Sequence, residues 1–291
     1  MNVGAAVTRG MELTRAALFR PFRLERWLKL GVVFFLASLV DPTWSGYSSP
    51  SLPRFGGHAS APMTWPRPIE LEWVAIGGAV AIVVLSIVAL AVAWVGCRGS
   101  MMAFRAVERG DADAGLGAFR ELGAPADALF RSFAVVWLGA AAVLAPLALH
   151  ALWRALSMHA AGEADEAIAR ALVPHAILGA LAFGAVLFAA FVVRAFIAPI
   201  LFQTRCTARE ALGRTLALVR SDPGGAVLYA LVRVAVGMAL GLASTIVAFA
   251  TCCIGALPVV HQALLAPILF FDRALALEVT RAAAAEVATP R

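Results

Sequence analysis

Long apolar runs, separated by short segments that carry most of the arginines, set the pattern of this chain. A membrane-spanning helix needs about 20 mostly apolar residues, and runs of this kind lie at Trp73–Cys97, Ser132–Trp153 and Ala171–Phe202. The uncharged stretch Val234–Phe271 is too long for one span. The Gly and Pro within residues 251–258 therefore divide it into a fifth and a sixth helix.

The first apolar run, Leu30–Val40, is short, and it reaches across a bilayer only if Trp27 and Lys29 lie at the interface. The distribution of Lys and Arg supports counting it as a span. With six spans, eighteen basic residues fall on one side and four on the other, while Arg194 and Arg233 are embedded. Because positive residues collect on the cytoplasmic side, we predict a bacterial inner-membrane protein with both termini in the cytoplasm.

One ten-residue pattern occurs twice, each time where a helix returns to the cytoplasmic face. FIAPILFQTR covers Phe196–Arg205 and LLAPILFFDR covers Leu264–Arg273. Pro199 and Pro267 each remove a backbone donor and predict a helix kink. The arginine that ends each copy is expected at the headgroups. A looser version without the proline, RGSMMAFRAVERG, covers residues 98–110.

Amphipathic segments precede the outward helices. They cover residues 11–22, which stop at Pro21, residues 113–125, which stop at Gly123–Pro125, and residues 207–225. The last opens with a capping box, Thr207 with Glu210. Helices of this type lie in the plane of the membrane interface.

The predicted fold is all-α: a polytopic membrane helix bundle of about six transmembrane helices. It is built as three helical-hairpin repeats, each preceded by an in-plane amphipathic helix. We expect a single integral membrane domain, 1–291, with an irregular outer loop at 41–70 and repeat units at about 11–110, 111–206 and 207–278.

Composition supports the membrane interpretation. Hydrophobic residues make up 62% of the chain and charged residues 14%, whereas soluble domains have about 45–50% and about 25%. The net charge of +6 is also typical of nucleic-acid binding. Here the arginines flank apolar runs, so we expect contacts with anionic lipid headgroups on the cytoplasmic side and no nucleic acid.

Arg194 and Arg233 are the strongest candidate site residues, because an embedded arginine costs about 2.5–3.5 kcal/mol on insertion scales. One interpretation is that both extend to the inner headgroups. The other is a polar cluster with His261 and Gln262 that binds a lipid phosphate or another anion. Alignment of the two copies places Gln262 at the position of Arg194.

The sequence contains few residues of the types and spacings that catalysis or ion coupling requires. No Asp or Glu lies within the predicted spans, which argues against proton or sodium coupling. No hydrolase, metalloprotease or P-loop motif occurs, and the histidines show no metal-ligand spacing. We therefore predict no catalytic residues, no metal and no cofactor.

LFRPFRLERWLKLG at residues 18–31, the loop rich in Gly, Ser and Pro, and RGSMMAFRAVERG resemble uncharacterised bacterial polytopic membrane proteins. The hairpin repeat is also distantly similar to the membrane domain that accompanies glycerophosphoryl diester phosphodiesterases. The resemblance implies a fold and membrane residence but no chemistry. The leading functional hypothesis is a non-enzymatic membrane module that interacts with lipids or proteins, and the alternative is a permease or channel-like protein for an anionic or amphiphilic solute.

Overall fold

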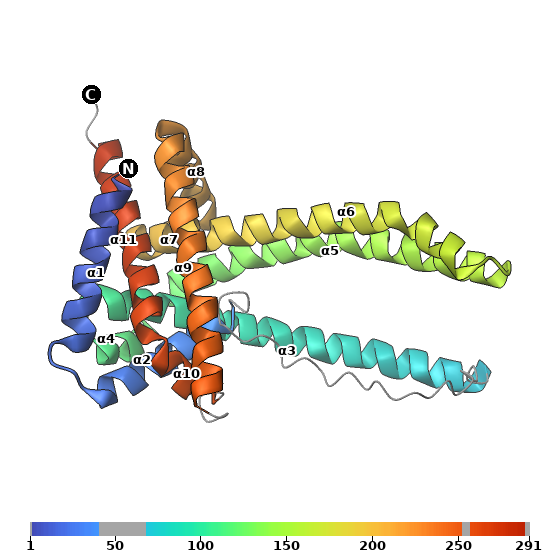
Figure 1. Cartoon of the computed structure of the whole chain (residues 1–291), viewed down its shortest axis with the longest axis horizontal. Helices are drawn as coiled ribbons and strands as arrows, with labels where there is room; N and C mark the ends of the chain where they lie inside the picture. Colours follow the sequence, from blue (N-terminus) through green and yellow to red (C-terminus); the bar gives the residue numbers. More distant parts are fainter. Residues whose placement is uncertain (1, 41–67, 252–256, 289–291) are drawn as a thin grey trace. The chain divides into compact units, whose positions relative to one another are not determined.

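Helices account for all the regular structure in the described part of the chain. The computed structural model describes residues 2–40, 68–251 and 257–288 (Figure 1). In chain order its elements are α1 (Val3–Phe19), α2 (Leu24–Ser38), α3 (Pro68–Arg109), α4 (Ala112–Gly117), α5 (Gly123–Ala160), α6 (Asp165–Val192), the π-helix η1 (Val193–Ile197), α7 (Ala198–Thr204), α8 (Ala208–Ser221), α9 (Pro223–Ala250), α10 (Pro258–Leu264) and α11 (Ala266–Ala288). Most of the predicted outer loop, residues 41–67, lies outside the described residues.

Among the described residues, four helices are long and apolar enough to cross a membrane. They are Val83–Arg109, Gly123–Ala160, Asp165–Thr204 and Pro223–Ala250. They correspond to the predicted second, third, fourth and fifth spans. The described residues thus form helices of the length and apolarity found in membrane proteins. The two remaining spans stay predictions, since the first run belongs to the 15-residue α2 and the last is divided between α10 and α11.

Large apolar side chains on these four helices are exposed, as expected for helices that face lipid. Examples are Leu85 on α3, Leu138 on α5, Leu181 on α6 and Phe249 on α9, with exposed fractions of 66%, 70%, 67% and 82%. A soluble domain rarely leaves such extended apolar surface in water.

The chain divides into two compact units. Unit 1 contains Met1–Val3, Asp127–Ala230 and Ala276–Arg291, and unit 2 contains Gly4–Ala126 and Leu231–Leu275. Within unit 1, α5 and α6 run side by side as a hairpin (Figure 1). The turn between them contains Gly162 with a φ of +75°, a conformation that glycine adopts without strain.

In unit 2, α2 packs on α3, α4 and α10. Two glycines allow these close approaches. A Cβ atom at Gly99 of α3 would collide with the backbone of Leu36 in α2. A Cβ atom at Gly31 of α2 would lie 2.7 Å from the carbonyl oxygen of Val259 in α10. Cys97, Met101 and other side chains of the second half of α3 are therefore fully buried.

Two local predictions are confirmed and one is wrong. The capping box of Thr207 and Glu210 begins α8, and α1 ends at Phe19, before Pro21. The amphipathic segment 113–125, however, does not stop at Gly123–Pro125. It forms only the six-residue α4, and Gly123 instead begins α5. A proline is tolerated in the first turn of a helix, where no N–H is needed, so Pro125 marks a helix start.

Candidate anion site

A buried ion pair joins α9 to α11 in unit 2. The Arg233 Nε lies 3.2 Å from the Asp272 Oδ1, and its Nη1 donates to the backbone oxygen of Asp272 at 3.5 Å. Arg233 is only 4% exposed. Because a buried charge is stable only when it is paired, Asp272 explains how this arginine is accommodated in a membrane helix.

His261 makes the second polar link between helices of unit 2. Its Nε2 lies 3.0 Å from the hydroxyl oxygen of Ser244 on α9, at hydrogen-bonding distance. Both residues are buried, with exposed fractions of 4% and 3%. The bond fixes α10 against α9 and so positions the next residue, Gln262.

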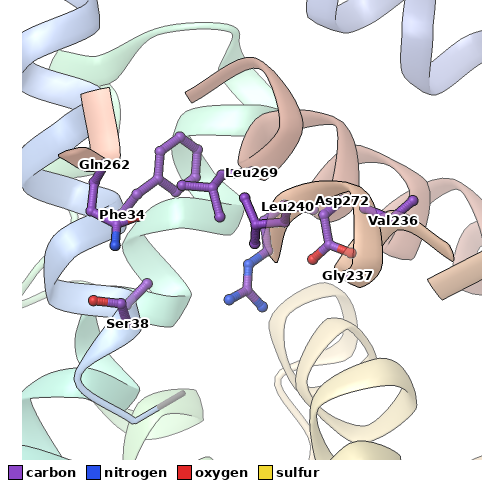
Figure 2. Close-up of a pocket in the computed structure, with 10 residues that line it drawn as sticks. Phe34, Ser38, Val236, Gly237, Leu240, Gln262, Leu269 and Asp272 are labelled. Carbon is purple, nitrogen blue, oxygen red and sulfur yellow. The ribbon is translucent and has the colours of Figure 1, made fainter. Parts of the chain in front are cut away.

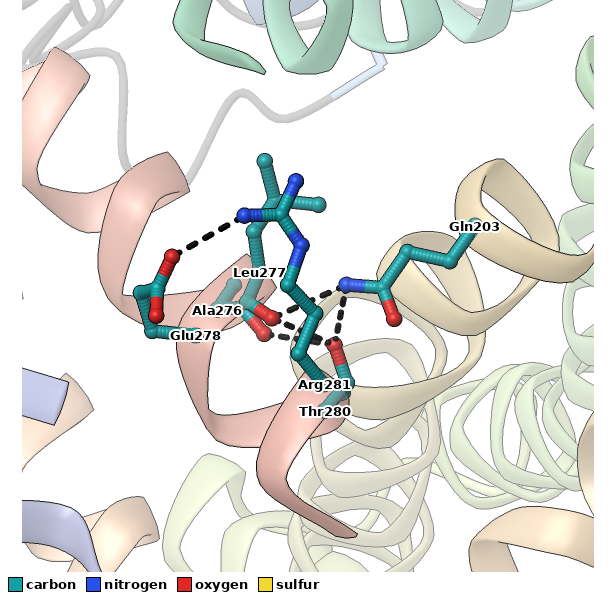
Figure 3. Close-up of polar contacts among 6 residues, drawn as sticks. All are labelled: Gln203, Ala276, Leu277, Glu278, Thr280 and Arg281. Carbon is teal, nitrogen blue, oxygen red and sulfur yellow. Dashed lines mark hydrogen bonds and ion pairs between the residues drawn. The ribbon is translucent and has the colours of Figure 1, made fainter. Parts of the chain in front are cut away.

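Gln262 is fully buried, yet neither its amide nitrogen nor its amide oxygen has a hydrogen-bond partner among the described residues. A buried polar group left unsatisfied costs about 1–3 kcal/mol, and such groups in native proteins usually find a protein or water partner. Gln203 offers a contrast in unit 1, because its Nε2 donates to the Leu277 oxygen and to the Thr280 Oγ1, both at 2.9 Å (Figure 3).

Gln262 lines a pocket enclosed by α2, α9, α10 and α11 (Figure 2). The other polar residues on its wall are Ser38, Asp272 and Arg273, and the remainder is mostly apolar. The centre of a water-sized sphere can occupy about 30 Å³ of it, and roughly 10–15 Å³ by this measure holds one water. The pocket therefore admits one or two groups of the size of water, such as the end of a larger ligand.

The charges around the pocket favour an anion. Arg233 pairs with Asp272, and Arg273 places a further guanidinium on the wall of the pocket. Arg273 is only 8% exposed, with its guanidinium carbon 5.3 Å from the centre of the Phe104 ring. Its guanidinium thus packs within unit 2, and its position at the level of the headgroups stays a prediction. A buried guanidinium on a pocket wall attracts an anion more strongly than one in bulk water.

The four predicted site residues are placed differently. Gln262 lines the pocket, Arg233 acts on it through Asp272, and His261 anchors α10 beside it. Arg194 belongs to unit 1, inside η1. It is 8% exposed, and its guanidinium carbon lies 5.9 Å from the centre of the Phe133 ring.

The two predicted kink prolines occupy matching positions. Pro199 is the second residue of α7 and Pro267 the second residue of α11. Each follows an irregular stretch: η1 precedes α7, and a break at Leu265 separates α10 from α11. The two irregular stretches are also aligned in the sequence repeat, which supports equivalent kinks.

Sequence reasoning missed three residues. Asp272 lies one position beyond the predicted sixth span, where charges are common, so the sequence alone did not indicate its proximity to Arg233. His150 of α5 and His175 of α6 form a pair, with Nδ1 of the first 2.8 Å from Nε2 of the second. Their equal distance from the hairpin turn was a signal that could have revealed the pair.

The comparisons with known proteins agree with a membrane protein of unassigned activity. Residues 1–289 match a family of unknown function, DUF7544. The chain belongs to the DUF7544 family. No curated protein and no solved structure matches it. The likeness to the membrane domain beside glycerophosphoryl diester phosphodiesterases thus stays a prediction.

Proposed function

We propose that this DUF7544 protein is a non-enzymatic integral membrane module that binds an anionic group in the Gln262 pocket. The observation that carries the proposal is the buried and unpartnered amide of Gln262 on the wall of a pocket with Arg273. The ligand is an oxyanion, supplied either by the phosphate of an anionic lipid or by a free anion. Its oxygen would accept from the Gln262 amide and from Arg273, since charge-assisted bonds of this kind are strong.

The remaining candidates have supporting roles in this proposal. Arg233 and Asp272 neutralise each other's charge beside the pocket. His261 holds α10 in place through Ser244. Arg194 is a second anion contact in unit 1. Its alignment with Gln262 in the repeat, together with its burial, supports this assignment.

The proposal includes the full predicted topology: six spans in a bacterial inner membrane, both termini in the cytoplasm, and three hairpins each preceded by an in-plane helix. Four helices of sufficient length and apolarity support four of the spans. The excess of arginine on the inner side supports the orientation. The partners are then anionic lipids of the cytoplasmic leaflet.

The permease hypothesis requires polar side chains along a continuous path through the bundle. The Gln262 pocket has room for only one or two groups of the size of water, which favours binding over conduction. Uptake of phosphate or chloride into vesicles that contain the purified protein would favour the permease.

The test replaces Gln262→Leu, with Gln203→Leu as the matched control. Binding of phosphatidylglycerol and of inorganic phosphate is measured separately, which distinguishes a lipid from a free anion as the source. We expect Gln262→Leu to lose the anion and, without anion, to be at least as stable as wild type because two unsatisfied groups are removed. Gln203→Leu should be less stable, because satisfied bonds are lost, but should keep the anion.

Unchanged binding of both probes by Gln262→Leu would refute the pocket as an anion site. If this variant is also destabilised, Gln262 has a satisfied partner, such as a buried water, and its role is structural.

A further inference from the structure

A second and larger apolar hollow lies in unit 2, between α1, α9 and α11. Its volume is about 670 Å³, within the range of roughly 300–1,000 Å³ of ligand sites. Its principal apolar wall residues are Met11 and Phe19 of α1, Val236 and Ala239 of α9, and Ile268 and Phe271 of α11. Glu12 and Arg15 of α1 are the charged residues on its edge.

Small residues create this groove. Gly10 brings α1 against α11, since a Cβ atom there would lie 3.3 Å from the Phe271 ring. On the α9 side the short side chain of Ala239 fills little of the groove. Val236 lines both this groove and the Gln262 pocket, so the two hollows are neighbours separated by the α9–α11 packing.

The groove is continuous with a surface that faces lipid. Val236 and Ala239 belong to α9, one of the four helices able to cross a membrane. On the same helix Met238 and Leu242 are 71% and 65% exposed. Within a bilayer an apolar groove of this size is filled by acyl chains rather than by water, because apolar cavities do not hold water.

Arg15 supplies a charge that matches a phospholipid. It is exposed and lies on the groove edge, and α1 also carries Arg9, so the single acid Glu12 leaves this helix cationic. A guanidinium binds phosphate with two parallel hydrogen bonds. An acyl chain in the groove would thus be accompanied by a phosphate at its edge.

We propose that this groove binds one acyl chain of an anionic phospholipid, with the phosphate held by Arg15. The inference rests on the membrane residence in the proposed function but not on the Gln262 pocket. We call α1 the lipid clamp, because this N-terminal helix forms one wall of the proposed lipid site.

The experiment measures phosphatidylglycerol retained by the full-length protein in detergent, using native mass spectrometry. Ala239→Trp fills the groove, and Ala180→Trp on the exposed face of α6 is the matched control. We expect Ala239→Trp to bind about tenfold more weakly or worse, because losing only two buried methylene groups already corresponds to about tenfold. Ala180→Trp should bind as wild type.

Arg15→Gln tests the clamp with little risk to folding, since the side chain is exposed, and Arg9→Gln is its control. Arg15→Gln should weaken binding of phosphatidylglycerol more than that of phosphatidylcholine. Glycerophosphoglycerol, the same headgroup without chains, should not compete. Equal retention by Ala239→Trp and Ala180→Trp, or effective competition by the free headgroup, would overturn the proposal.

The Gln262→Leu variant separates the two sites. In this variant the anion in the pocket should be lost while one phosphatidylglycerol stays in the groove. Loss of all lipid in Gln262→Leu with full retention in Ala239→Trp would assign the lipid to the pocket and refute the groove.

Discussion

The Tyr229 hydroxyl donates a 3.0 Å hydrogen bond to the carbonyl oxygen of Ala195, inside the π-helix η1. In a regular helix this carbonyl would accept the N–H of residue 199. Residue 199 is a proline and has no N–H. Pro199 thus offers this carbonyl no donor, and the fully buried Tyr229 supplies one.

The first prediction tests whether the contributions of Tyr229 and Pro199 to stability are coupled. Tyr229→Phe should lower the free energy of unfolding by about 1–3 kcal/mol, because it leaves a buried carbonyl without a donor. In a Pro199→Ala background the helix N–H is available again, so the same change should cost less. Denaturation in detergent measures all four combinations. An equal cost in both backgrounds would show that Pro199 and Tyr229 act independently.

The repeat explains how much of this arrangement was predictable. The aligned prolines, Pro199 and Pro267, predicted where η1 and the break at Leu265 interrupt the regular helix, because a proline effect is local. The tyrosine partner was not predictable, because Tyr229 lies in a different helix and only tertiary packing brings it to Ala195. The copies also end differently: α7 stops at Arg205 in a left-handed conformation, whereas α11 continues through Arg273.

The second prediction concerns Arg233 and Asp272. Asp272→Ala should destabilise the protein by about 3–5 kcal/mol, because it leaves a buried guanidinium unpaired. The double variant Arg233→Met with Asp272→Leu should recover most of the loss, since no buried charge remains. The pair Glu278–Arg281, seen in Figure 3, is the control, because its Arg281 side chain is 44% exposed. Breaking it should cost at most about 1 kcal/mol.

Thermal denaturation in detergent checks this prediction. A double variant as unstable as Asp272→Ala would mean that the pair is needed for packing rather than for neutralising its own charges.

Only part of the candidate site could be predicted from the sequence, because the rest depends on tertiary packing. Arg233 and Gln262 stand out in the sequence because polar residues are rare in apolar runs. Asp272 and Arg273 do not stand out, because they follow the apparent end of a span, where charges are common. Only tertiary packing places Arg273 in the interior and Asp272 beside Arg233.

The third prediction compares two glycines. Gly99→Ala should destabilise by about 1–3 kcal/mol or more, because the added methyl group meets the backbone of α2 and a packed interface cannot absorb it. Gly213→Ala in α8 has open space around it and should stabilise by about 0.5–1 kcal/mol through its better helix propensity. Unfolding free energies measure both, and a neutral Gly99→Ala would contradict the close α2–α3 packing.

The last prediction decides how many helices cross the membrane. With six spans, reporter fusions after Gly110, Arg214 and Arg291 should lie in the cytoplasm and a fusion after Gly162 in the periplasm. With only the four long helices crossing, the fusions after Gly110, Gly162 and Arg214 would give the same result, but Arg291 would be periplasmic. The fusion after Arg291 is therefore the informative one.

We expect a cytoplasmic signal at Arg291. Four spans would place the six basic residues before Leu30 and the last three arginines outside, against the bias of positive residues toward the cytoplasm. Paired fusions to alkaline phosphatase, active outside, and to a fluorescent protein, fluorescent inside, measure the location. A periplasmic Arg291 with a cytoplasmic Gly110 would leave four spans and place α1, with its proposed lipid clamp, on the outer side.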